Sequence, residues 1–251
     1  MSLTPEELSR YGRQMMLPGF GPQGQEKLRA AQVLIAGVGG LGSPLALYLA
    51  AAGVGRIVLA DNDSVSLSNL NRQILHWEED LDRPKVESAA DKLGRLNSRI
   101  EIIPRRIDIT PQTVDRLVEG CQVVLDGLDS FETRRLLNRA CFKASVPFIY
   151  GGVHGLTGMT STFIPGQTAC LACLFPGSMP AEIFPVLGAT PGLIACLQAT
   201  EAVKLLTGLG QPLAGRLLIY NGQEMDFREV EINPNPDCPV CHGAATASAE
   251  D

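Results

Sequence analysis

The stretch Gln32-Val33-Leu34-Ile35-Ala36-Gly37-Val38-Gly39-Gly40-Leu41-Gly42 decides the fold class, because a short apolar run leads directly into a glycine-rich turn. Residues 43–52 then have helical composition, and a second apolar run over residues 56–60 ends at Asp61. This succession of strand, glycine turn, helix, strand and acid predicts a βαβ unit of the kind that opens nucleotide-binding folds.

The glycines of the turn have distinct expected roles. Gly37 allows the tight turn, Gly39 lets the backbone approach a phosphate, and Gly42 allows the helix to pack closely on the strand. The helix that follows presents free N–H groups to an anion, and Asp61 can accept hydrogen bonds from ribose hydroxyls. The pattern favours nucleotide binding over a purely structural glycine turn, but it does not distinguish NAD from ATP.

Outward from this unit, strands and helices keep alternating as far as Gly151. The alternation predicts an α/β, Rossmann-like, mostly parallel sheet covered by helices on both faces. Beyond Gly151 the strands lack intervening helices of matching length, so we expect an antiparallel C-terminal extension. The expected helices cover residues 8–15, 23–30, 111–118, 132–144 and 192–206, and the expected strands cover residues 100–107, 122–126, 147–151, 157–164, 216–221 and 225–232.

Composition narrows the remaining possibilities. The chain has 251 residues, of which 45% are hydrophobic, and a net charge of −6. These values suit one folded domain and argue against disorder and against nucleic-acid binding by bulk positive charge. The long uncharged stretches, residues 30–55 and 144–181, are broken by glycine and proline, so no membrane span is expected. The acidic N-terminus lacks the apolar core of a signal peptide, which favours a cytoplasmic protein.

Two C-x-x-C pairs indicate a structural metal site. The paired residues are Cys170, Cys173, Cys238 and Cys241. Four thiolates make a closed tetrahedral Zn²⁺ site, which would clamp the C-terminal part of the chain onto its middle. A redox pairing of the thiols is the weaker alternative. Cys121 and Cys141 lie in apolar contexts and are expected in the core.

A polar segment, residues 64–73, follows the second strand and carries Arg72, and Lys85 comes soon after it. An enzyme that handles a triphosphate needs such positive charge to neutralise the pyrophosphate that leaves. By spacing alone, both side chains could equally be ordinary surface residues.

A second polar segment, residues 126–130, follows a strand of the parallel sheet. Ligands of open α/β sheets bind at the carboxyl ends of the strands, where one carboxylate could hold Mg²⁺ against phosphates. The alternative is that Asp126 or Asp129 merely caps the following helix.

Several of these motifs together resemble the ThiF/MoeB/HesA family, the prokaryotic relatives of the ubiquitin-activating enzymes. The resemblance covers residues 11–243. It rests on the glycine turn, the paired cysteines, Arg10-Tyr11-Gly12-Arg13-Gln14, Ser68-Asn69-Leu70-Asn71-Arg72-Gln73 and Arg83-Pro84-Lys85. It implies a single domain with N-terminal helices over residues 1–30, a nucleotide-binding part over 31–151, a carrier-binding and zinc part over 152–243, and a flexible tail over 244–251.

The resemblance implies a homodimeric, ATP-dependent adenylyltransferase that activates the C-terminal Gly-Gly of a ubiquitin-like sulfur carrier of the ThiS or MoaD kind. The acyl adenylate would lead to a thiocarboxylate for thiamine or molybdopterin biosynthesis. Catalytic roles fall to Arg13, which would reach the neighbouring subunit's ATP, to Arg72 and Lys85, and to Asp129 as the Mg²⁺ ligand. The nucleotide-binding positions are Gly37, Gly39, Gly40, Gly42, Asp61, Ser68, Asn69, Leu70, Asn71, Arg72, Lys85, Asp129 and Ser130.

The chain departs from the family pattern at two places. Gly127-Leu128-Asp129-Ser130 stands where relatives have Cys-Thr-Asp-Asn, and the crossover segment, residues 174–190, has no cysteine. We therefore expect adenylation without a covalent enzyme–carrier intermediate, with sulfur from a separate donor. Cys196 falls in a helical pattern and is expected to be packed. The alternatives are a catalytically altered ATP-binding or partner-binding module, an enzyme that adenylates a peptide or amino acid, and, least favoured, an NAD-dependent dehydrogenase.

Overall fold

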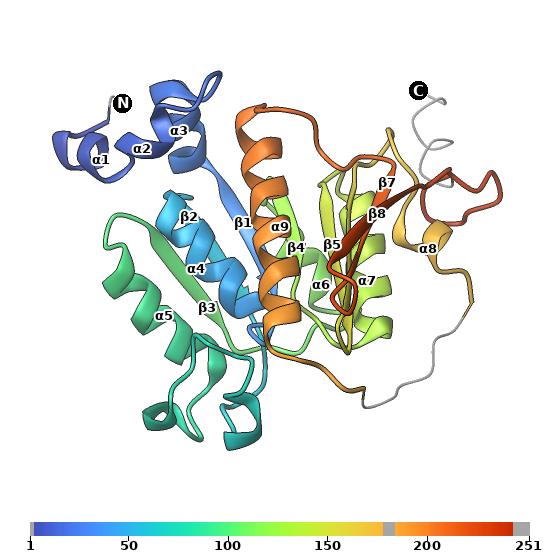
Figure 1. Ribbon diagram of the computed structural model, residues 1–251, viewed down its shortest axis with the longest axis horizontal. Coiled ribbons are helices and arrows are strands. Elements are labelled where there is room, and N and C mark those ends of the chain that lie inside the picture. Colours follow the sequence, from blue (N-terminus) through green and yellow to red (C-terminus); the bar gives the residue numbers. More distant parts are fainter. Residues whose placement is uncertain (1–2, 178–183, 243–251) are drawn as a thin grey trace.

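The computed structural model describes residues 3–177 and 184–242, so the tail expected over residues 244–251 lies outside it, as does part of the crossover segment. In the described ranges, eight strands form one sheet with the order β3-β2-β1-β4-β5-β6-β7-β8 (Figure 1). The strands are β1 (Gln32–Ala36), β2 (Arg56–Ala60), β3 (Glu101–Arg105), β4 (Val123–Asp126), β5 (Phe148–His154), β6 (Thr157–Phe163), β7 (Arg216–Asn221) and β8 (Asp226–Glu231).

The first five strands make a parallel half-sheet in the Rossmann order. β1 pairs with β2 on one side and with β4 on the other, and all pairings from β3 to β5 are parallel. Ala36 at the end of β1 is in register with Ala60 and Asp126. The carboxyl ends of β1, β2 and β4 therefore meet at one edge, and the strand order reverses direction between β1 and β4, where such sheets bind ligands.

The last three strands form the predicted antiparallel extension. β5 pairs with β6, β6 with β7 and β7 with β8, all antiparallel. The extension continues the parallel half without a break, so the sheet is mixed and the predicted fold class is confirmed.

Helices cover both faces of the sheet, as predicted. Alternate strand residues contribute to two apolar clusters, one beneath α3, α4, α5 and α9, the other beneath α6, α7 and α8 (Figure 1). Each face is covered because the strands of a parallel sheet are apolar on both sides. The helices are α1 (Pro5–Arg10), α2 (Gly12–Met15), α3 (Gly21–Ala30), α4 (Gly42–Ala52), α5 (Lys85–Leu96), α6 (Val114–Val118), α7 (Phe131–Lys143), α8 (Leu171–Leu174) and α9 (Ala189–Thr207), with short 3₁₀ turns at Leu67–Asn69 and Glu78–Asp80.

The structure differs from the sequence-based expectation at two places, before β1 and between β2 and β3. The helix expected over residues 8–15 is two short helices separated at Tyr11, whose ring is buried and whose hydroxyl accepts a hydrogen bond from Asn97. The sequence pattern also missed α5, which begins at Lys85 directly after Pro84. Thr4 caps α1 with its hydroxyl, and Glu7 completes the capping box.

None of the helices in the described ranges combines the length and apolar character needed to cross a bilayer.

Candidate functional site

A cavity of about 730 Å³ opens at the carboxyl ends of β1, β2 and β4. Its lining includes residues of the glycine turn, the end of β2, the segment that carries Arg72, the start of α5, the segment after β3 and the β4–α7 loop. The predicted site residues among them are Gly37, Gly39, Gly40, Asp61, Arg72, Lys85 and Asp129. These predicted residues, brought together in one cavity, are as far as 92 positions apart in the sequence, counting from Gly37 to Asp129.

The glycine turn has the geometry that its sequence predicts. Gly37 has a φ of +87°, a conformation that favours glycine. A Cβ at Gly42 would lie 1.9 Å from the carbonyl oxygen of Gly37, so close packing there excludes any side chain. At Gly39, in contrast, the nearest heavy atom would lie at 3.5 Å, an ordinary contact. Packing within the protein therefore does not require a glycine at position 39. Because Gly39 lines the cavity, the absence of a side chain there leaves its backbone accessible to a ligand.

Asp61 holds the glycine turn from the side of β2. Its Oδ2 accepts a hydrogen bond of 2.7 Å from the Val38 N–H, and its Oδ1 accepts one of 2.8 Å from the Asp63 N–H. The carboxylate is half-buried and lines the cavity, so lone pairs remain available for a ligand hydroxyl.

The two cavity cations predicted from the sequence, Lys85 and Arg72, differ in their surroundings. Lys85 has a side chain that is only 6% exposed, and its Nζ lies 2.8 Å from a carboxylate oxygen of the exposed Asp63. The Arg72 guanidinium donates to the Ser68 carbonyl oxygen at 2.9 Å and to Asn71 Oδ1 at 3.0 Å. Lys85 is therefore not the ordinary solvated surface residue of the alternative interpretation.

The remaining predicted residues lie outside the lining. Ser68, Asn69, Leu70 and Asn71 belong to the turn before Arg72, and Asn69 accepts a hydrogen bond from the Ser66 N–H. Arg13 lies exposed on α2 and is not part of this chain's cavity.

Ser130 is the N-cap of α7, and its hydroxyl accepts a hydrogen bond from the Thr133 N–H at 3.4 Å. The alternative interpretation, that Asp126 or Asp129 merely caps this helix, is therefore wrong. Asp129 is exposed in the cavity, and Asp126 is fully buried.

Asp126 forms a buried ion pair with Arg134, a cavity-lining residue that the sequence analysis missed. The Arg134 Nε lies 2.9 Å from Asp126 Oδ2, and Nη2 donates to the carbonyl oxygens of Leu128 and, at 2.9 Å, of Gly151. Burial lowers the pKa of Arg134, but the Asp126 carboxylate outweighs it and raises that pKa. The pair ties the loop that carries Asp129 to β5. The sequence did carry a signal for this ion pair, namely an acid at the end of a buried strand and an arginine eight residues later.

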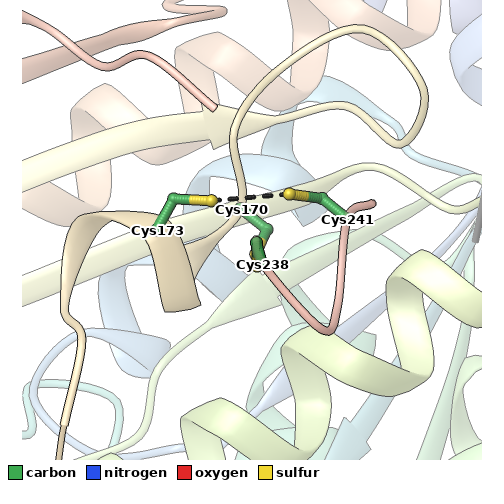
Figure 2. Close-up of side chains that lie close together, drawn as sticks. All are labelled: Cys170, Cys173, Cys238 and Cys241. Atoms are coloured by element: carbon green, nitrogen blue, oxygen red, sulfur yellow. Dashed lines mark hydrogen bonds between the residues drawn. The ribbon is translucent and has the colours of Figure 1, made fainter. Parts of the chain in front are cut away.

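The two C-x-x-C pairs come together as predicted, outside the cavity. The Sγ atoms of Cys170 and Cys238 are 3.6 Å apart, those of Cys173 and Cys241 are 3.4 Å apart, and all four lie within 4.8 Å of one another. Figure 2 shows Cys173 and Cys241 pointing toward each other from α8 and from the loop after β8. The Asn235 N–H also donates to the Cys173 sulfur at 3.4 Å.

This four-cysteine cluster suits a metal ion. A tetrahedron with metal–sulfur distances of about 2.3 Å has sulfur–sulfur edges of about 3.8 Å, close to the spacing observed. Burial raises the pKa of Cys238, but hydrogen bonds from the N–H groups of Cys241 and Val240 outweigh it and lower that pKa to about 7. At least one thiol is thus close to its ionised, metal-binding form at neutral pH. His242 is not part of the cluster; its backbone N–H donates to the Cys238 carbonyl oxygen.

The other three cysteines lie outside the four-cysteine cluster. Cys121 and Cys141 are buried in the apolar cluster beneath α6 and α7, as expected, and burial raises the pKa of both. Cys196 is half-buried on α9.

The fold and the cavity define a protein of the Rossmann-like, nucleotide-binding class, with an added antiparallel sheet and a four-cysteine cluster. The sequence model of the ThiF family matches residues 11–240. The chain therefore belongs to the ThiF family.

Individual relatives agree with this assignment. The chain is 40% identical to the SAMP-activating enzyme E1 of Haloferax volcanii, over all of this chain and 95% of that protein. It is 39% identical to the sulfur carrier protein adenylyltransferase of Thermus thermophilus, over 96% of this chain and 93% of that protein. A crystal structure of Escherichia coli MccB with ATP superposes with a TM-score of 0.82, at 26% identity, over 92% of this chain and 74% of that chain.

These findings make the chain an enzyme of the nucleotidyltransferase class. They also argue against the alternative of an NAD-dependent dehydrogenase, since the Thermus relative is by name an adenylyltransferase.

Proposed function

We propose that this enzyme uses ATP to adenylate the C-terminal Gly-Gly carboxylate of a ubiquitin-like sulfur carrier, of the ThiS or MoaD kind. The observation that carries the proposal is the cavity, in which an open glycine backbone, the cations Arg72 and Lys85 and the exposed carboxylate of Asp129 face one volume. The names of the Haloferax and Thermus relatives support the choice of a small carrier as the substrate.

The reaction needs positioning and charge neutralisation more than a protein nucleophile. A carrier carboxylate oxygen forms a bond to the α-phosphorus of ATP, the bond from that phosphorus to the bridging oxygen breaks, and pyrophosphate leaves with that electron pair. Arg72 and Lys85 would stabilise the charge that develops on the phosphates. Asp61 would bind the ribose hydroxyls while it holds the glycine turn.

Mg²⁺ would be held by Asp129, whose exposed carboxylate lines the cavity together with Asp63. Carboxylate oxygens are the ligands that this ion prefers. When bound, Mg²⁺ supplies positive charge to the phosphates of the nucleotide. The ion pair of Asp126 with Arg134 would keep the Asp129 loop in place for that contact.

Zn²⁺ would occupy the four-cysteine cluster in a structural role. Four thiolates leave no open coordination position for a substrate, and the cluster lies outside the cavity. Its proposed effect is on folding, because it joins α8 to the segment that follows β8.

A homodimer would complete the site. Arg13 is exposed on α2 and absent from this chain's own cavity, which suits a role at the neighbouring subunit's ATP. Sulfide-level sulfur from a separate donor would then form a bond to the acyl carbon, the bond from that carbon to the AMP oxygen would break, and AMP would leave with that electron pair. The product would be a thiocarboxylate for thiamine or molybdopterin biosynthesis. The crossover segment has no cysteine to carry the acyl group. We therefore expect no thiol-sensitive enzyme–carrier adduct by mass spectrometry.

The test is Mg²⁺-dependent exchange of labelled pyrophosphate into ATP, with each Gly-Gly-ending carrier of the same genome added separately. Exchange should appear with one carrier and should be lost in Asp129→Ala. The matched control is Asp115→Ala, because Asp115 is an exposed acid on α6 that pairs with Lys143. This control should exchange normally.

Tight ATP binding without exchange for any carrier would overturn the proposal. That result would favour the partner-binding module, and exchange only with a peptide or amino acid would favour that substrate class instead.

A further inference from the structure

The imidazole of His76 is buried directly behind the glycine turn. His76 is 3% exposed; its Nε2 lies 2.9 Å from the Val38 carbonyl oxygen, and its Nδ1 lies 2.9 Å from Ser88 Oγ. A carbonyl oxygen only accepts hydrogen bonds, so Nε2 carries the proton of the neutral ring, and Nδ1 accepts from the Ser88 hydroxyl. The ring is therefore held as one neutral tautomer, with Nε2 as the hydrogen-bond donor and Nδ1 as the acceptor.

A chain of buried polar groups orients this ring from behind. Ser88 Oγ accepts a hydrogen bond of 3.0 Å from Lys92 Nζ, and Lys92 forms an ion pair with the buried Asp80. Asp80 also accepts a 2.8 Å hydrogen bond from the Trp77 N–H. Ser88 and Lys92 lie one turn apart on α5, so this helix supports His76 against the glycine turn.

The peptide groups around Val38 are thus held from two directions. The Val38 N–H donates to Asp61, and the Val38 carbonyl accepts from His76 at 2.9 Å and, more weakly, from the Ser43 hydroxyl at 3.3 Å. In a trans peptide, the carbonyl of Val38 and the N–H of Gly39 point in opposite directions. Fixing this carbonyl on His76 therefore fixes the direction of the Gly39 N–H, and Gly39 lines the cavity.

We propose that His76 is a positioning residue that directs the Gly39 N–H toward a nucleotide phosphate in the cavity. The inference rests on the proposed function, since that function places a triphosphate against the glycine turn. His76 itself is separated from the cavity by the turn and acts through the Val38–Gly39 peptide.

The test compares the affinities of His76→Phe for ATP and for adenosine by calorimetry. A backbone N–H on a phosphate is a hydrogen bond to a charged group, so ATP affinity should fall about tenfold or more. Adenosine has no phosphate, and its affinity should change less than about twofold. His76→Gln, whose amide can still donate to the Val38 carbonyl, should recover part of the ATP affinity.

Ser88→Ala provides a milder variant in case His76→Phe does not fold. It removes the hydroxyl that donates to Nδ1, and ATP affinity should fall several-fold with adenosine affinity retained. Ser161→Ala is the matched control, because Ser161 is also buried but its hydroxyl has no hydrogen-bond partner within the described ranges. Its ATP affinity should equal that of the unaltered chain.

Equal losses of ATP and adenosine affinity, or unchanged ATP affinity in His76→Phe and Ser88→Ala, would overturn the inference. Failure of the unaltered chain to bind ATP would instead overturn the proposed function. The amide NMR signal of Gly39 separates the two cases: it should shift in Ser88→Ala without any nucleotide, and an unshifted signal would refute the positioning role.

Discussion

Two alanine substitutions in the glycine turn should have opposite consequences. Gly39→Ala should leave the fold intact and impair nucleotide binding, whereas Gly42→Ala should destabilise the fold. The difference follows from what a Cβ would meet at each position. At position 39 the nearest heavy atom, Gln73 Nε2, would lie 3.5 Å away, while at position 42 the carbonyl oxygen of Gly37 would lie 1.9 Å away.

The size of each effect follows from these distances. At position 42 the contact is with backbone, which has to move by about 1 Å or more, and overpacking of this kind costs about 1–3 kcal/mol. We expect the upper end, about 3 kcal/mol, which lowers the melting temperature by about 6–12 °C in a chain of this size. At position 39 φ is not positive, so alanine should keep or slightly raise stability, by up to about 1 kcal/mol.

The assay is thermal unfolding followed by circular dichroism, with ATP affinity measured by calorimetry on the same preparations. Gly39→Ala should lose at least about tenfold in affinity, because its methyl group would stand where a phosphate meets the backbone. A Gly39→Ala variant that binds ATP like the unaltered chain would refute the placement of phosphate at this turn. An unchanged melting temperature for Gly42→Ala would refute the packing argument.

Two further perturbations test the four-cysteine cluster and His76. Cys238→Ser should lower the melting temperature, while the folded variant should still bind ATP. A zinc chelator should lower the melting temperature of the unaltered chain but should not lower that of Cys238→Ser further. An equal effect of the chelator on both proteins would contradict a metal at the cluster. Burial lowers the pKa of His76, with Lys85 and Lys92 adding to the effect and the Val38 hydrogen bond and Asp80 opposing it. The unfolded chain therefore takes up a proton near the ordinary pKa of 6.5, before the folded chain does, and the free energy of unfolding should fall as the pH drops below that value. Urea titrations at about pH 7.5 and about pH 5.5 measure this fall in the free energy of unfolding. The fall should be smaller in Ser88→Ala than in the unaltered chain, because the neutral His76 ring loses the hydrogen bond from the Ser88 hydroxyl. A free energy of unfolding that does not change with pH in the unaltered chain would refute the assigned protonation.

The succession of strands and helices and the glycine turn were predictable because their signals are local. An apolar run followed by Gly37, Gly39 and Gly42 specifies a turn wherever it occurs, and alternation of short strands with helices specifies a parallel sheet. The pairing of the cysteines was predictable for a different reason, since matched C-x-x-C spacing implies one shared metal over any distance in the chain.

Long-range polar contacts were not predictable in the same way. The bond from His76 to Val38 and the ion pair of Lys85 with Asp63 depend on where α5 packs, and the sequence pattern missed α5. This helix begins without a Ser, Thr, Asp or Asn cap, because Pro84 precedes it, so the usual start signal is absent. The sequence analysis considered only Asp126 and Asp129 as caps of α7, although Ser130 is also a residue type that caps helices; the structure shows that Ser130 has this role.

The four-cysteine cluster also has a consequence for chain entropy. Cys170 and Cys238 are 68 residues apart, so a metal shared by them closes a loop that contains the crossover segment, α9, β7 and β8. Closing a loop of that length removes conformations from the unfolded chain worth about 4 kcal/mol. Within the loop, α9 packs against α4 and β5, which lie outside the loop. A metal bound by the cysteines should therefore also raise the free energy of unfolding of the part of the molecule that contains the cavity.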